Sequence, residues 1–106
     1  MSKKTKKEQL KLFPEKPIGY ATILLEAAGI ATERQAEYGE AVESVGLACK
    51  ILDETFNIKL TVMEFCEVLV ALKLSRQKFK YKKDNILDSI NYLAIGILSE
   101  EQKKNG

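Results

Sequence analysis

The chain has 106 residues, of which 45% are apolar and 30% are charged, and its formal net charge is +2. This length fits one domain with a short extension, and the apolar fraction excludes a disordered chain. The sequence lacks the roughly 18 consecutive apolar residues of a membrane span, and no apolar segment follows the basic start as in a secretory signal. Histidine is absent, which excludes Cys–His and Ser–His–Asp catalysis and every imidazole zinc site.

Residues 1–17 are predicted to form a flexible basic tail. The first 12 residues contain five lysines and a single acid, and Pro14 and Pro17 interrupt regular structure. The remaining residues, 18–106, are predicted to form one helical domain. We therefore expect a domain that carries a mobile, positively charged N-terminal extension.

The first half of the domain is predicted to contain two helices. Apolar residues at helical spacing indicate a helix over about 19–29 that ends at Gly29. Thr32 is then suited to cap a long helix over about 33–56. Glycine is unfavourable within a helix, so we expect close packing or a bend near Gly39.

The second half is predicted to add two more helices. Thr61, with Glu64 in the capping-box position, indicates a helix over about 62–78 whose apolar composition favours a buried, central position. A basic connection over 78–83 precedes a fourth helix, which begins at Asp84 or Asn85 and frays over 100–106. The predicted fold class is therefore an all-α bundle of about four helices.

The two cysteines are predicted to be buried thiols. Cys49 and Cys66 lie within apolar helical patterns and form no CxxC motif. This usage is typical of a reducing compartment, so we expect a cytoplasmic protein without a disulfide.

Two charged residues interrupt otherwise apolar helix faces. Lys73 follows Cys66 and Leu69 at helical spacing, and Asp88 lies on a face with Asn91. Burying an unpaired charge costs several kcal/mol of folding free energy, so each of these two residues needs a partner of opposite charge. One interpretation is that Lys73 and Asp88 simply pair and fix the packing of their helices. The other is that they form the floor of a pocket.

The pocket interpretation predicts a metal site. Asp84 and Asp88 are one helical turn apart, and their carboxylates suit Mg²⁺ beside substrate phosphates. A further acid from the second helix is then required, for which Glu40 and Glu43 are the candidates.

The same interpretation predicts contacts to phosphate. Lys73 and Arg76 would meet phosphate oxygens, with the guanidinium able to bind two of them. Arg34 and Tyr38, four residues apart, would add a further phosphate contact and a stacking ring.

Three motifs resemble a known group of domains. Arg34-x3-Tyr38-Gly39, then the segment 72–76 (Leu-Lys-Leu-Ser-Arg), then the segment 83–92 (Lys-Asp-Asn-x2-Asp-x3-Tyr) resemble a family of small, functionally uncharacterised phage and prophage domains, over roughly residues 20–97. The order of elements also resembles the all-α nucleoside-triphosphate pyrophosphatases of the MazG and dimeric dUTPase type. That resemblance implies Mg²⁺ held by acids on two helices, although only Glu40-x2-Glu43 remains of the family's Glu-Glu-x2-Glu pattern.

The tail carries a second resemblance. Residues 9–13, Gln-Leu-Lys-Leu-Phe, resemble the QLxLF pentapeptide by which bacterial polymerases and repair proteins bind the sliding clamp. The resemblance implies that Leu12 and Phe13 enter an apolar pocket while Gln9 forms a hydrogen bond and Leu10 contributes apolar contact. The alternative is that Leu10, Leu12 and Phe13 pack on the chain's own bundle or on a second subunit.

Three functions follow as hypotheses. The first is a phage-type accessory protein of DNA metabolism, a nucleotide- or partner-binding domain whose tail engages the sliding clamp. The second is a Mg²⁺-dependent nucleoside-triphosphate pyrophosphohydrolase. The third is a nucleic-acid-binding protein that uses the basic segment 76–83, in which Phe79 and Tyr81 are interleaved with lysines. Four short helices with one nearly all apolar also favour a homo-oligomer.

Overall fold

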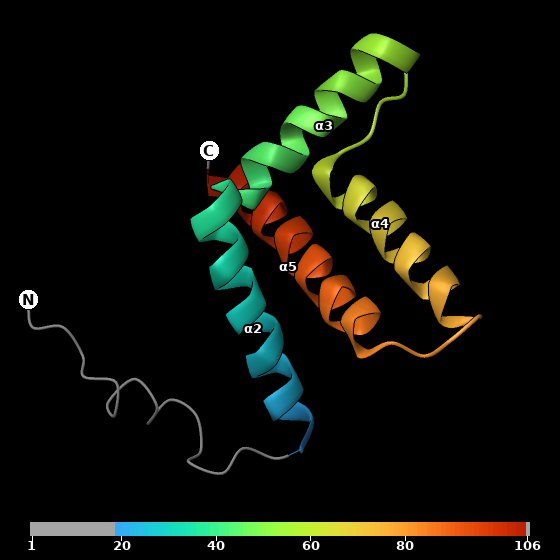
Figure 1. The fold of residues 1–106 in the computed structure, drawn as a ribbon. Helices are drawn as coiled ribbons and strands as arrows, with labels where there is room; N and C mark the ends of the chain where they lie inside the picture. The colour runs from blue at the N-terminus through green and yellow to red at the C-terminus, as the bar shows by residue number, and fades with distance from the viewer. Residues whose placement is uncertain (1–18, 106) are drawn as a thin grey trace, which may run out of the picture.

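The structure, a computed structural model, describes residues 19–105 and contains four helices (Figure 1). These are α2 (Gly19–Tyr38), α3 (Ala41–Phe56), α4 (Val62–Gln77) and α5 (Lys83–Asn105). No strand occurs within residues 19–105. The predicted all-α fold is therefore confirmed for this part of the chain.

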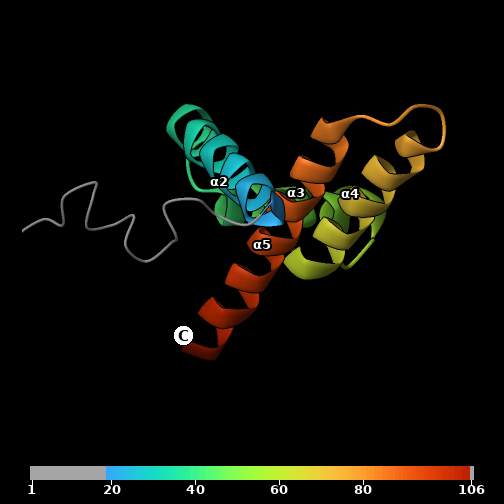
Figure 2. The ribbon, with the colours of Figure 1, turned by 90° about the horizontal axis from the view of Figure 1, so that it is seen from below.

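Helix α5 is the central element. Helix α2 packs along one side of α5 and α4 along the other, and α3 leads away from the end of α2 (Figure 1). The view from below shows α5 between α2 and α4 as well (Figure 2). A close approach of α4 and α5 occurs at Gly96, where an added Cβ would lie 2.6 Å from Met63 Sδ. The glycine in α5 therefore sets the spacing of this helix pair.

The boundary between the first two helices differs from the sequence prediction. Helix α2 continues through Gly29 to Tyr38, and Thr32 lies inside it with its hydroxyl donating to the Ala28 carbonyl at 3.0 Å. The break falls at Gly39, whose φ of +80° suits a residue without a side chain. The prediction that Gly29 ends a helix was wrong, because Gly29 does not adopt the left-handed conformation in which glycine commonly ends a helix.

The connection between α3 and α4 follows the sequence prediction. Asn57 ends α3 in the left-handed conformation, with φ of 55°. Thr61 and Glu64 form a reciprocal capping box: the Glu64 N–H donates to Thr61 Oγ1 at 3.1 Å, and the Thr61 N–H donates to Glu64 Oε1 at 3.0 Å. The hydrogen bond from the Thr61 backbone lowers the pKa of the Glu64 carboxyl.

The described part of the chain has a thin core. Its buried apolar residues are Ala27, Cys49, Cys66 and Leu87. The radius of gyration is 16.3 Å, whereas a compact chain of this size has about 12 Å. The prediction that α4 is a buried central element was wrong, because Val68 and Leu72 are about half exposed. The fourth helix also extends further than expected, to Asn105, rather than fraying from residue 100.

No helix within residues 19–105 is long and apolar enough to cross a membrane.

Candidate functional site: the clefts beside Asp88

Asp88 joins three helices through two ion pairs. Its carboxylate lies 2.9 Å from Lys73 Nζ of α4 and 3.6 Å from an Arg34 guanidinium nitrogen of α2. The side chains of Lys73 and Asp88 are 18% and 16% exposed, so water screens this pair poorly. The predicted proximity and sequestration of Lys73 and Asp88 are confirmed. Arg34 is 61% exposed and thus keeps most of its donors available to a ligand.

An acidic cleft of about 440 Å³ opens on the same carboxylate. Its lining comes from one side of α2 and the first turns of α5, and it consists of Ile30, Glu33, Arg34, Glu37, Tyr38, Asp84 and Asp88. Four carboxylates thus face a single guanidinium. Such a cleft attracts cations and repels an anion that arrives without one.

An apolar cleft of about 350 Å³ adjoins the acidic one. It lies where α2 meets α3 and is closed by α5, with Val45, Tyr92, Ile95 and Leu98 among its lining residues. Arg34 and Tyr38 line both clefts. These two side chains therefore stand between a charged compartment and an apolar one.

The other predicted site residues lie elsewhere. Glu40 precedes α3 and accepts a hydrogen bond from Gln35 Nε2 at 3.0 Å, and neither Glu40 nor Glu43 lines the acidic cleft. Glu33 and Glu37 of α2 occupy that place instead. Arg76 is exposed at the end of α4 and lines a separate basic hollow with Phe79, Lys80, Lys82 and Asn85.

The carboxylates and thiols of residues 19–105 are spaced too widely to hold a metal ion by themselves. Within residues 19–105 no three Asp, Glu or Cys side chains come together in the manner of a metal site. Asp84 and Asp88 nevertheless share the acidic cleft as predicted, and Asp84 has no ion pair within the described chain. A magnesium ion here would need ligand oxygens and water to complete its coordination.

The cysteines are separate from these clefts and are confirmed as free, buried thiols. Burial raises the pKa of the Cys66 thiol and that of the Cys49 thiol. A protonated thiol is a poor nucleophile, which favours the structural interpretation of both residues.

Several polar residues of the segment 83–92 hold the fold. Lys83 Nζ lies 2.8 Å from Glu26 of α2, and the Asn91 amide donates to the Ala27 carbonyl at 3.0 Å. The buried Asn85 amide donates to Gln77 Oε1 at 2.8 Å, which closes the loop between α4 and α5. Sequence reasoning did not assign these roles, because each partner lies on another helix or loop.

A family model described as a domain of unknown function, DUF6378, matches residues 22–99. The chain belongs to this family. The matched range covers α3, α4, most of α2 and α5, and the lining of both clefts, so the DUF6378 domain corresponds to the helical part of the chain. Searches of curated proteins and of solved structures found no match. The tail residues Gln9, Leu10, Leu12 and Phe13 lie outside the described residues and outside the matched range.

Proposed function

We propose that the protein binds a nucleotide as its magnesium complex in the two clefts beside Asp88. The observation that carries this proposal is that Arg34 and Tyr38 line both clefts. A nucleotide has a charged end and a planar end of low polarity. In the proposed complex, the magnesium-bound phosphates lie in the acidic cleft and the base lies in the apolar cleft.

The charge of the acidic cleft supports the metal complex over the bare anion. Free triphosphate would meet Glu33, Glu37 and Asp84, none of which has an ion pair within residues 19–105. Magnesium bound to the phosphates removes this repulsion and usually takes only one or two protein carboxylates. Asp84 is the residue we assign to it, while Asp88 is already neutralised by Lys73.

The remaining residues bind rather than react. Arg34 offers guanidinium donors to phosphate oxygens, and the exposed Tyr38 ring offers a face for stacking. Lys73 contacts Asp88 behind the cleft and holds that carboxylate in place. Hydrolysis would require acids gathered around the metal and the phosphates. Glu33 and Glu37 line the cleft where Glu40 and Glu43 do not, but no three acids within residues 19–105 come together as a metal site, so binding without cleavage is the function proposed.

The test measures the binding of a fluorescent deoxynucleoside triphosphate in the presence and in the absence of Mg²⁺. Asp84→Asn should weaken Mg²⁺-dependent binding by about ten- to a hundredfold, because it removes a charged ligand. Glu43→Gln, which alters an acid outside the cleft, is the matched control and should bind as the unaltered protein does. Equal binding in the absence of Mg²⁺, or an unaffected Asp84→Asn variant, would contradict the proposal.

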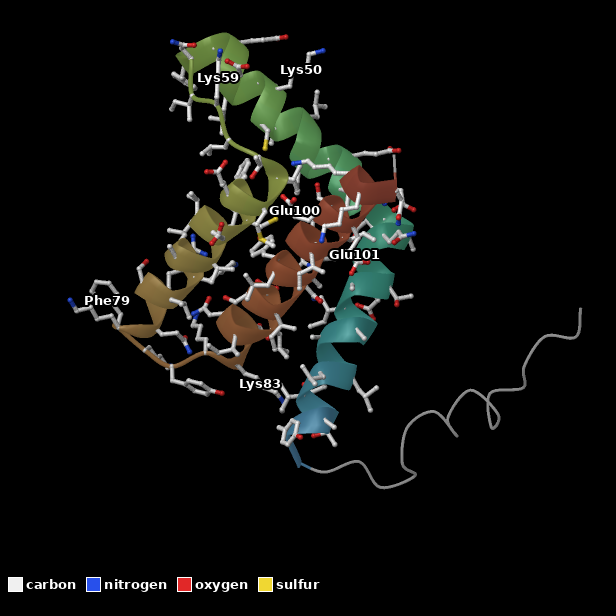
Figure 3. The ribbon with its side chains drawn as sticks, turned by 180° about the vertical axis from the view of Figure 1, so that it is seen from behind. Lys50, Lys59, Phe79, Lys83, Glu100 and Glu101 are labelled. Carbon is white, nitrogen blue, oxygen red and sulfur yellow. The ribbon has the colours of Figure 1, made fainter. Side chains whose placement is uncertain are left out.

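A second candidate function is binding of single-stranded nucleic acid at the loop between α4 and α5. Phe79 is 92% exposed, and its ring extends away from the helices (Figure 3). Tyr81 is also exposed, and Arg76, Lys80 and Lys82 line the adjoining hollow of about 560 Å³. Exposed rings among cations suit base stacking and backbone contact.

This candidate is distinguished by its salt dependence. Affinity for an oligothymidylate should fall steeply as salt rises, and Phe79→Ala with Tyr81→Ala should abolish most of it. Tyr20→Ala alters an equally exposed ring on α2 and is the control. If the double variant still binds the oligothymidylate, the loop between α4 and α5 is not the nucleic-acid-binding site.

The phage-type and clamp-binding parts of the hypothesis depend on the sequence alone. We retain as a proposal that residues 9–13 bind the bacterial sliding clamp, since the pentapeptide precedes the helical domain as a separate segment.

A further inference from the structure

Asn91 brings an amide to the apolar cleft from the central helix α5. The other amide in the lining, that of Gln35, belongs to α2 and is exposed, whereas Asn91 is only partly exposed. Ala94, Ile95 and Leu98 of α5 line the same cleft and are apolar. A polar atom in such a setting is poorly solvated once a ligand fills the cleft, so its hydrogen bond distinguishes strongly between ligands.

A hydrogen bond to α2 fixes the orientation of the Asn91 amide. Its Nδ2 donates to the Ala27 carbonyl at 3.0 Å. A backbone carbonyl only accepts hydrogen bonds, so the amide nitrogen has to face Ala27 and the amide oxygen has to face elsewhere. The two ends of this amide are therefore not interchangeable.

The amide oxygen of Asn91 is open to the cleft. No donor within residues 19–105 contacts Asn91 Oδ1, yet no buried side-chain oxygen or nitrogen in this part of the chain lacks a partner. Oδ1 is therefore accessible to solvent. Asn91 lines the apolar cleft and neither the acidic cleft nor the basic hollow beside Arg76. An occupant of the apolar cleft thus meets a hydrogen-bond acceptor that is already held in place.

We propose that Asn91 is a specificity-determining residue, whose Oδ1 accepts a hydrogen bond from an N–H group on the edge of the base. This inference rests on the proposed nucleotide binding and adds the chemistry by which the base is recognised. A base with an N–H donor pairs with Oδ1, whereas a ring of the same shape without a donor leaves Oδ1 both desolvated and unpaired. The apolar lining accepts either ring, so the hydrogen bond makes the difference between them.

The test compares ligands that differ only in the donor. Binding in the presence of Mg²⁺ is measured for dATP and for dCTP, each beside the analogue in which hydrogen replaces the exocyclic amino group and no N–H remains on the base. Within each pair the amino ligand should bind about tenfold more tightly. Equal affinities within both pairs would overturn the role of Asn91 and leave nucleotide binding in place. If none of the four ligands binds, the proposed function and this inference fail together.

Asn91→Ala separates recognition of the base from support of the fold. It should weaken the binding of dATP and dCTP to the level of their analogues, so that the ratio within each pair falls to about one. A purely structural residue would instead weaken all four ligands alike and keep the ratio. Lys83→Met is the matched control, because it also removes a contact between α2 and α5 but lies outside both clefts, and it should keep the ratio. An unchanged ratio in Asn91→Ala would refute the proposal.

Discussion

At the residue scale, Asp88 is the position on which the largest part of the site depends. One carboxylate contacts a cation on each of two neighbouring helices, and only Arg34 of these two is well exposed. A largely buried charge that loses its partner is costly, because neither water nor a counter-ion compensates it. Asp88 is therefore both a structural residue and part of the cleft wall.

We expect Lys73→Met to lower the free energy of unfolding by about 3 kcal/mol, measured by urea denaturation, because it leaves Asp88 with only the more distant Arg34. The double change Lys73→Met with Asp88→Leu should recover most of that loss, since no buried charge remains. Lys83→Met is the control: its pair with Glu26 is about half exposed, so the change should cost less than about 1 kcal/mol. A Lys73→Met variant as stable as this control would show that the buried pair contributes little.

At the element scale, helix ends were predictable where a side chain makes the cap. The Thr61–Glu64 pair was predictable because the two halves of the capping box are three residues apart in the sequence. The sequence did not show which of Gly29 and Gly39 ends the first helix, because either glycine can do so. In the structure it is Gly39 that adopts a positive φ. The choice is made by the packing of α2 along α5, which the local sequence does not contain.

The same limit applies to the candidate site. The pairing of Lys73 with Asp88 was predictable because each charge interrupts an apolar stripe. Glu33 and Glu37 were missed although they lie in the predicted second helix, because that helix was expected to continue past Gly39. The break at Gly39 leaves both acids on α2 with Arg34 and places Glu43 on α3. Four-residue spacing of Glu33 and Glu37 beside Arg34 was the signal that could have identified them.

The close approach of α4 and α5 predicts opposite effects for two glycine substitutions. Gly96→Ala should destabilise the protein by about 1–3 kcal/mol, because the new Cβ meets Met63. Gly46→Ala should stabilise it by about 0.5–1 kcal/mol, because it lies within α3 with no atom within 4 Å of the added Cβ. Thermal unfolding of both variants measures the difference. Two shifts of the same sign would contradict the described packing.

At the scale of the whole molecule, the family match separates the helical domain from residues 9–13, whose sequence resembles the clamp-binding pentapeptide. The family match begins at residue 22 and so includes none of the tail. We expect Leu12→Ala with Phe13→Ala to abolish binding to a bacterial sliding clamp without changing the melting temperature. Phe13 alone contributes about 1.5–3 kcal/mol when it is fully buried, roughly ten- to a hundredfold in affinity.

The control for the tail is Leu24→Ala, which alters an exposed leucine on α2 and should leave clamp affinity unchanged. The competing hypothesis, in which the tail packs on the bundle, predicts the reverse pattern for the double variant. A lowered melting temperature with unchanged clamp affinity would establish that alternative.

Helix α3 extends away from the other helices, and we expect it to unfold locally before they do. Leu47, Ile51 and Phe56 of this helix are exposed, whereas α5 holds Asn85, Leu87 and Ser99 buried. Amide hydrogens in α3 should therefore exchange with solvent through local opening of this helix. Those in α5 should exchange only when the whole domain unfolds. In deuterium labelling followed by mass spectrometry, peptides from 41–56 should exchange well before peptides from 85–99. The helical domain would then consist of two cooperative units, α3 and the other three helices, joined at Gly39 and at residues 57–61.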